Sequence, residues 1–148
     1  MNKLLQAGDH APSLPLLEET LAGGPALLAF FKVSCPVCQF TFPFLERIAK
    51  SGSMRVFGVS QDDAKATRHF AKEFGVTFRM LLDEEQAGYR TSNAFGVSTV
   101  PTVFLVDAGG VVAYTSEGFV KRDLAELGRR AGVEVFRQDE SVPEWKAG

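Results

Sequence analysis

Two cysteines three positions apart are the residues of this chain best suited to chemistry. Cys35 and Cys38 are its only cysteines, and Pro36 and Val37 stand between them. Positions i and i+3 of a helix are neighbours, close enough for the Cα separation of about 4.4 to 6.8 Å that a disulfide needs. The pair can therefore alternate between a dithiol and an internal disulfide. Two cysteines are too few for a disulfide scaffold, and a chain of 148 residues can bury a core without one.

The place of the pair in the chain assigns a role to each thiol. Residues 26–31 (ALLAFF) are typical of a strand buried on both faces, and this run ends just before the pair. A helix that begins at the pair has its free N–H groups and the positive end of its dipole there, which stabilises a thiolate at Cys35. Pro36 suits the first helical position, because its missing N–H would be unpaired there anyway. We expect Cys35 to be the exposed nucleophile and Cys38, one turn deeper, to be the resolving thiol.

Half of a zinc site, or two inert buried thiols, are the alternatives to redox chemistry. Zinc would need two more ligands, and the two histidines, His10 and His69, stand far apart with no ligand spacing. We therefore expect no metal site, and no motif of the chain implies a nucleotide, a flavin or another cofactor. Redox chemistry is favoured because the CxxC motif stands between a buried strand and a helix.

Strand and helix patterns alternate around the cysteines. A helix is expected from the cysteines to about residue 52, followed by a strand over 55–60. Further helices are expected over 63–74, 84–95 and 120–131, a strand over 77–82, and a hairpin of 102–106 and 111–115 around the turn 107–110. The first half thus predicts parallel strands and the second an antiparallel pair. The predicted fold class is α/β, a mixed central sheet with helices on both faces.

Composition and charge set the expected organisation. We expect a single domain over residues 1–148, with a core of about 8–131 and a polar tail of about 138–148 anchored by Trp145. A net charge of −2 without a cluster of Lys or Arg argues against a nucleic-acid partner. No apolar run reaches signal-peptide length or the about 18 residues of a membrane span. A cytoplasmic location is expected, or a periplasmic one if a leader has been removed.

Several segments carry a resemblance to a known family. Residues 27–48 (LLAFFKVSCPVCQFTFPFLERI) resemble the active-site strand, turn and helix of the thioredoxin superfamily, and residues 99–102 (TVPT) resemble its cis-proline segment. Residues 8–12, 57–62 and 107–110 are similar to the branch that holds TlpA/ResA-type thiol-disulfide oxidoreductases and AhpC/TSA peroxiredoxins. The resemblance spans about residues 8–131 and implies a thioredoxin-like fold.

This resemblance implies a thiol-disulfide oxidoreductase that acts on protein thiols or disulfides and has a separate redox partner. In the family the proline packs beside the disulfide, and the residue before it offers backbone hydrogen bonds to an extended substrate. These roles fall to Pro101 and Val100. The dipeptide between the cysteines has no charge or histidine that would strongly stabilise a thiolate. We therefore expect a reductase, with a potential toward the lower end of about −270 to −120 mV. We also expect a monomer.

Three positions depart from the family pattern. Ala29 stands where thioredoxins proper have a buried aspartate, Ser34 where a tryptophan is usual, and Thr41 where TlpA/ResA-type proteins often have a glutamate. Either carboxylate would help to move the proton of the buried thiol. Proton transfer at Cys38 is therefore expected to rely on water or on a group that the sequence does not identify. Pro43 matches the helix-kinking proline of the family.

A peroxiredoxin-like thiol peroxidase is the alternative function. Such enzymes need a proline seven residues, and a Thr or Ser three residues, before the peroxidatic cysteine. For Cys35 these positions hold Leu28 and Lys32, and for Cys38 they hold Phe31 and Cys35. Copper-handling relatives are a further alternative, but they have CxxxC and a distant histidine before the last hairpin, which this chain lacks.

Other residues near the motif are weaker candidates. Lys32 could stabilise the Cys35 thiolate, although a lysine at a strand end is more often simply solvated. The phenylalanines that border the site could supply an apolar docking surface, and they are Phe31, Phe40, Phe42, Phe95 and Phe119. His10 and His69 are expected at the surface.

Overall fold

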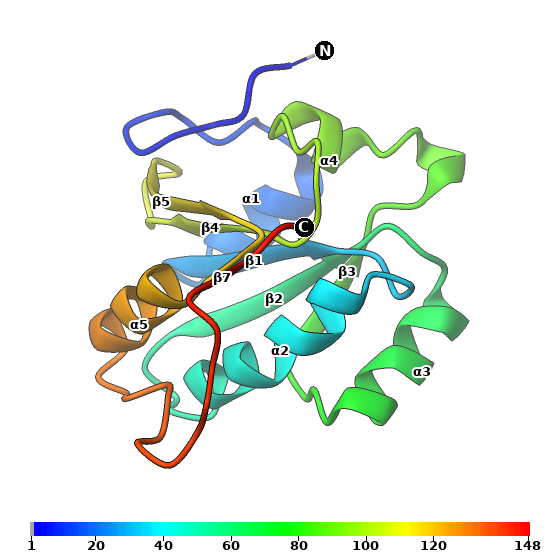
Figure 1. Cartoon of the computed structure of the whole chain (residues 1–148). Coiled ribbons are helices and arrows are strands. Elements are labelled where there is room, and N and C mark those ends of the chain that lie inside the picture. The colour runs from blue at the N-terminus through cyan, green and yellow to red at the C-terminus, as the bar shows by residue number, and fades with distance from the viewer. Residues whose placement is uncertain (1) are drawn as a thin grey trace.

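Six residues without a charge, Ala26–Phe31, form strand β1 at the centre of a five-stranded sheet (Figure 1). The computed structural model describes residues 2–148, and its sheet has the order β3-β2-β1-β4-β5. The other four strands are β2 (Arg55–Ser60), β3 (Arg79–Leu82), β4 (Thr102–Val106) and β5 (Val112–Glu117). The pairs β1–β2 and β2–β3 are parallel, whereas β4 runs antiparallel to both β1 and β5. The predicted mixed sheet is confirmed.

Helices cover both faces of this sheet (Figure 1). The helices are α1 (Pro15–Leu21), α2 (Pro36–Ala49), α3 (Ala64–Phe74), the 3-10 turn η1 (Glu85–Ala87), α4 (Arg90–Ala94) and α5 (Lys121–Arg130). Residues of α2, α3 and α5 share one hydrophobic cluster, whereas those of α1 and α4 share the cluster on the opposite face. A separate two-stranded ribbon joins β6 (Phe119–Val120) to β7 (Trp145–Lys146).

The alternation of side chains along β1 explains why its end is rigid. Leu27, Ala29 and Phe31 pack into the cluster under α2, and Leu28 and Phe30 pack into the opposite one. All five side chains are fully buried. Burial of each large apolar side chain stabilises the fold by about 1.5 to 3 kcal/mol. Packing on both faces therefore fixes the position of the end of β1, from which the chain continues to the cysteines.

Two expected elements differ from the structure. The strand predicted from residue 77 begins only at Arg79, because the N–H and hydroxyl of Thr77 donate to the buried carboxylate of Glu46. The single helix predicted over 84–95 is wrong: Gly88 and Tyr89, both with left-handed backbone, separate η1 from α4. The sequence pattern also missed α1, a short helix of seven residues.

Buried Asp83 explains why α4 starts where it does. Its carboxylate accepts hydrogen bonds from the backbone N–H groups of Thr91 and Ser92, at 2.9 and 2.7 Å, and from the Ser92 hydroxyl at 2.6 Å. A side chain that satisfies the first N–H groups of a helix fixes where that helix begins. An acceptor that stands eight and nine residues before its donors is not visible as a local helix pattern.

The predicted tail is held mainly by contacts other than the side chain of the expected anchor. The Trp145 indole is 64% exposed, so it does not pack as an anchor, although the Trp145 backbone pairs with Val120. Instead, Arg47 makes two hydrogen bonds to the carboxylate of Glu140, at 2.8 and 2.7 Å. Phe136 packs against Phe44, with ring centroids 4.9 Å apart. Within residues 2–148 no helix is long and apolar enough to cross a membrane.

Candidate active site

Cys35 is the N-cap of α2, and its sulfur accepts the hydrogen bond that a capping oxygen usually accepts. The Cys38 N–H donates to Cys35 Sγ at 3.1 Å. Pro36 occupies the start of the helix, as predicted. The sulfur therefore lies at the end of the helix where the N–H groups point outward and the dipole is positive. A thiolate formed on Cys35 would be stabilised by this arrangement.

Cys38 lies behind Cys35 in the hydrophobic cluster. Its side chain is fully buried, whereas that of Cys35 is partly exposed, and both thiols are free. Burial raises the pKa of the Cys38 thiol well above its usual range, and its hydrogen bond with Cys35 raises it further. The predicted division between an outer and an inner thiol is thus present in the geometry.

The loop between β1 and α2 is fixed by polar contacts to neighbouring segments. The Val33 N–H donates to the carboxylate of Asp62 at 2.8 Å, and the Gln39 side chain donates to the Val33 carbonyl at 2.9 Å. The Gln61 N–H donates to the Phe31 carbonyl at 3.1 Å. These bonds tie the loop to the segment that follows β2 and to α2, so Cys35 has a defined position.

The segment around Pro101 lies beside the outer thiol. Cys35 Sγ is 3.5 Å from the carbonyl oxygen of Val100, although 65 residues separate the two in the sequence. The Val100–Pro101 peptide bond is cis. Pro101 is buried and Val100 is partly exposed. The structure therefore brings together Cys35, Cys38, Pro36, Val100 and Pro101, the five residues predicted for the site.

The positions that depart from the family pattern lie close to Cys38. Ala29 belongs to the same hydrophobic cluster as Cys38, and Thr41 is fully buried one turn further along α2. The Thr41 hydroxyl donates to the carbonyl of Val37 at 2.6 Å. Among the described residues no carboxylate contributes to the raised pKa of Cys38. Ala29 and Thr41 therefore supply no carboxylate for proton transfer at this thiol.

The weaker candidates separate into core and surface residues. Phe31, Phe42, Phe95 and Phe119 are fully buried, so they belong to the core and cannot form a docking surface. Phe40 alone of the five candidates is partly exposed. The remaining candidates, Lys32, His10 and His69, are exposed, as expected for the histidines.

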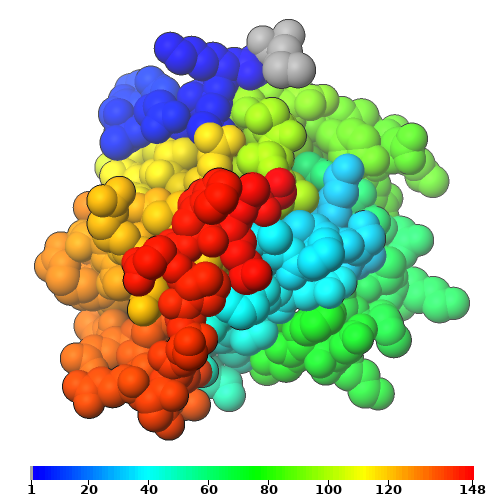
Figure 2. All heavy atoms as spheres, in the orientation of Figure 1, coloured from blue at the N-terminus to red at the C-terminus, as the bar shows by residue number. Residues whose placement is uncertain are grey.

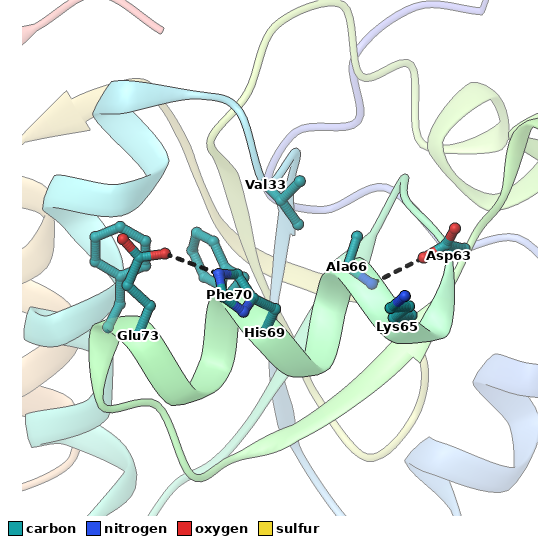
Figure 3. A pocket seen from close by; sticks show the side chains of 8 residues that line it. Val33, Asp63, Lys65, Ala66, His69, Phe70 and Glu73 are labelled. Carbon is teal, nitrogen blue, oxygen red and sulfur yellow. Dashed lines mark hydrogen bonds and ion pairs between the residues drawn. The ribbon is translucent and has the colours of Figure 1, made fainter.

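Two hollows flank the site. The polar one is lined by Lys32, Gln61, Tyr89, Ser92, Asn93 and the segment 97–100 beside the outer thiol. The apolar one follows α3 from Asp63 to Phe74 and meets the active-site loop only at Val33 (Figure 3). In this second hollow the exposed His69 Nε2 lies 3.6 Å from the carboxylate of Glu73. Within residues 2–148 no three His, Cys, Asp or Glu side chains are grouped so that they could hold a metal ion.

One neighbour of the site was not expected from the sequence. A Cβ atom at Gly148 would lie 2.5 Å from the Val100 carbonyl oxygen, so the last residues of the sequence reach the segment that Cys35 contacts. Lys146 lies over the Phe40 ring, with Nζ 5.3 Å from its centroid. In the sequence, Trp145 is the one residue of this segment that suggests packing against the domain, and its side chain is exposed to solvent. No local pattern could have located these contacts.

Comparison with known proteins places this geometry in a family. The Redoxin family model matches residues 6–129. The chain is 28% identical over 118 residues to the thiol:disulfide interchange protein DsbE of Xylella fastidiosa (strain 9a5c), covering 79% of this chain and 59% of that protein. It is 28% identical over 127 residues to the thiol-disulfide oxidoreductase ResA of Bacillus subtilis (strain 168), covering 77% and 69%. The chain thus spans little more than half the length of the first of these relatives.

Solved structures agree with this placement. The structure of MTB DsbF superposes with a TM-score of 0.64 at 31% identity, covering 77% of this chain and 83% of DsbF. The thioredoxin domain of a thiol-disulfide oxidoreductase from Bacteroides vulgatus superposes with a TM-score of 0.70 at 19% identity, covering 85% and 97%. At that identity the second match shows the thioredoxin-like fold alone. With the family model matching most of its length and the CxxC motif at the start of α2, this chain belongs to the Redoxin family.

Proposed function

We propose that this chain is a thiol-disulfide oxidoreductase in which Cys35 and Cys38 alternate between a dithiol and an internal disulfide. The observation that carries the proposal is the placement of Cys35 Sγ. It is partly exposed at the N-terminus of α2, 3.1 Å from the Cys38 N–H nitrogen and 3.5 Å from the Val100 carbonyl oxygen. The names of DsbE and ResA support the same activity.

The exchange proceeds in two displacements. The Cys35 thiolate attacks one sulfur of a substrate disulfide, whose S–S bond breaks, and the other sulfur leaves as a thiolate that takes up a proton. Cys38 then loses its proton and attacks Cys35 Sγ, which releases the second substrate sulfur as a thiol. Two electrons pass from the protein to the substrate, and the Cys35–Cys38 disulfide remains. A partner dithiol reduces this disulfide by the reverse steps.

The environment of each thiol determines when it reacts. The helix N-terminus and the Cys38 N–H stabilise negative charge on Cys35, so the first displacement begins there. Burial keeps Cys38 protonated until the mixed disulfide has formed. Because the Thr41 hydroxyl donates to a backbone carbonyl and position 29 holds an alanine, neither position supplies a carboxylate, and we propose that water entering beside the substrate removes the Cys38 proton.

The direction and partners are part of this proposal. The absence of a charge or histidine between the cysteines favours a reducing couple, and hence a reductase of protein disulfides that a separate dithiol partner regenerates. We propose that the protein works as a monomer. The cytoplasmic or periplasmic location remains a prediction, which fractionation of the source cells would test.

The geometry does not favour the peroxidase alternative. Among the described residues, the hydrogen-bonding neighbours of Cys35 Sγ are a backbone N–H and a backbone carbonyl, and no side-chain hydroxyl is one of them. Lys32 stands where a peroxidase has its Thr or Ser, and Leu28 is fully buried in the sheet where it has its proline. The peroxide-binding hydroxyl is therefore missing.

A redox titration tests the proposal. The protein is equilibrated in glutathione or dithiothreitol buffers, its free thiols are alkylated, and the two states are separated by mass. We expect one reversible two-electron transition below about −200 mV that is lost in Cys35→Ser. If no internal disulfide forms, or if Cys35 instead stops at a sulfenic acid with peroxide, the oxidoreductase proposal fails.

A further inference from the structure

The last residues of the sequence form a strand that runs along the edge of the active site. We refer to residues 144–148 as the strap. Phe119 pairs with Lys146 and Val120 with Trp145 in an antiparallel ribbon, and the Lys121 N–H donates to the Glu144 carbonyl at 3.0 Å. In Figure 2 the atoms at the end of the chain, coloured red, lie against those of the beginning of α2, coloured cyan.

The strap ends at the carbonyl that the outer thiol contacts. A Cβ at Gly148 would lie 2.5 Å from the Val100 carbonyl oxygen and 2.9 Å from Thr99 Oγ1. Cys35 Sγ is 3.5 Å from the same Val100 carbonyl oxygen. The strap and the nucleophilic sulfur therefore meet at one backbone group, which is part of the segment on which an extended substrate is expected to dock.

A close approach of backbones holds the strap in place. Gly118, just before β6, has a φ of +71°, and a Cβ there would lie 2.7 Å from the Lys146 carbonyl oxygen. Only a glycine allows the strap to lie this close while it keeps that conformation. On the other side, Lys146 Nζ lies over the Phe40 ring. Phe40 is the one border phenylalanine that is partly exposed, so Lys146 of the strap lies over part of the apolar surface at this rim.

The same contacts are few enough to be reversible. Two residue pairs form the ribbon, every residue of the strap is exposed, and the ion pair between Lys121 and Glu144 is long at 3.8 Å. Short two-stranded pairings are marginally stable, and exposed segments with few buried contacts open at low cost in free energy. The firmer tie, between Arg47 and Glu140, lies upstream of the strap and would hold its base while it opens.

We propose that the strap is an internal occupant of the substrate groove, which an extended polypeptide must displace in order to reach Cys35. The incoming segment would pair with the freed edge of Phe119–Val120 and lie against Val100, as the strap does now. This inference rests on the proposed function and adds to it a substrate class and an internal competitor. Small disulfides that need no strand pairing would react with Cys35 without displacing the strap.

The first test weakens the strap in the full chain. Lys146→Pro removes an N–H from the ribbon and the cation over Phe40, and Trp145→Ala, which removes only an exposed indole, is the matched control. We expect Lys146→Pro to reduce the disulfides of insulin about threefold or more faster, with the rate toward 5,5′-dithiobis(2-nitrobenzoate) unchanged. Equal rates toward insulin in both variants and the native protein would overturn the inference, as would equal acceleration of both substrates.

The second test needs no change in the strap. A disulfide-containing peptide is reacted with Cys38→Ser so that it is held on Cys35, and hydrogen exchange of the strap amides is compared before and after. We expect exchange at residues 145–148 to become at least about tenfold faster once the peptide is attached. If the peptide is attached to Cys35 and the strap amides keep their protection, the inference is refuted and the proposed function stands. If no mixed disulfide forms, it is the proposed function that fails.

Discussion

The outer rim of the active site and its inner wall lie one helical turn apart and have opposite physical character. At the rim, Cys35 Sγ is partly exposed and meets backbone polar groups of α2 and of Val100. At the wall, Cys38 is fully buried among apolar side chains, and burial raises its pKa. The rim exposes a sulfur to an incoming substrate, whereas the wall keeps its sulfur buried and favours the neutral thiol. In the proposed exchange, the depth of each sulfur therefore sets the order of the two displacements.

The largest effects are expected when the sulfur of each cysteine is replaced by oxygen, because the two variants should fail at different steps. We expect Cys35→Ser to lower the rate of insulin reduction by about a thousandfold or more, since no nucleophile remains at the rim. Cys38→Ser should keep the first displacement within about threefold but accumulate a mixed disulfide, which mass spectrometry without reductant detects. A mixed disulfide on Cys38 in the Cys35→Ser variant would reverse the assigned roles.

The pH dependence of the rate at which Cys38 resolves the mixed disulfide should measure the raised pKa of this thiol at the inner wall. Because the pKa of Cys38 is raised well above its usual range, its thiolate fraction rises about tenfold for each pH unit over the range pH 6 to 9. We expect the resolution step to follow this slope without a plateau, as measured by rapid quenching with acid after mixing with an oxidised peptide. If the rate of the resolution step instead reached a plateau near pH 8, burial would not be raising the pKa of Cys38 in the mixed disulfide.

A carboxylate introduced beside Cys38 should reduce the difference between wall and rim. Thr41→Glu places one at a buried position one turn beyond Cys38, where it can accept the proton. General-base catalysis typically contributes a hundredfold or more, but the cost of burying the charge lowers our expectation to about tenfold faster resolution at pH 7. Thr41→Gln is the control of equal size and should show no acceleration. Equal rates in the two variants would argue against proton transfer as the slow event.

The stability of the reduced protein should also depend on the wall. The folded-state pKa of Cys38 is raised above its unfolded value of about 8.5, so the native state keeps a proton that the unfolded state loses. This contribution is complete below pH 8.5 and is lost as the pH rises, by up to about 1.4 kcal/mol per unit. Urea unfolding of the reduced protein between pH 8 and 10 measures it. Cys38→Ala should lack this part of the decline.

The smallest effect is expected at the base of the strap. The hydrogen bonds from Arg47 lower the pKa of Glu140 to about 2, so the pair contributes above the unfolded pKa of about 4.3 and is lost as the pH falls toward 2. Because Glu140 is partly exposed and solvent screens the pair, Glu140→Gln should lower Tm at pH 7 by at most a few degrees. Thermal scans at pH 7 and pH 2 check this, and the difference from the native protein should vanish at the lower pH.

Local patterns were sufficient for much of the fold. The strand over 26–31 and the helix after the cysteines are present as predicted, because each depends on neighbours within a strand or a turn. The mixed sheet is also present, because the alternation of strands and helices and the hairpin limit how the strands can pair. The helix expected over 84–95 failed because Asp83, which fixes the start of α4, acts from outside the helix. Strand β3 begins late because Thr77 bonds to Glu46, a residue of α2.

The sequence by itself determined the chemistry of the site: two cysteines one helical turn apart, after a buried strand and with a proline at the first helical position. These are properties of adjacent residues, and local backbone geometry is enough to express them. The tertiary structure decided how Cys35 is surrounded. The family resemblance of residues 99–102 implied that Val100 belongs to the site, and the fold places its carbonyl beside the sulfur across 65 residues; the fold alone brought the strap to the same carbonyl. Such contacts arise from the packing of whole elements around a shared core, which no spacing along the chain encodes.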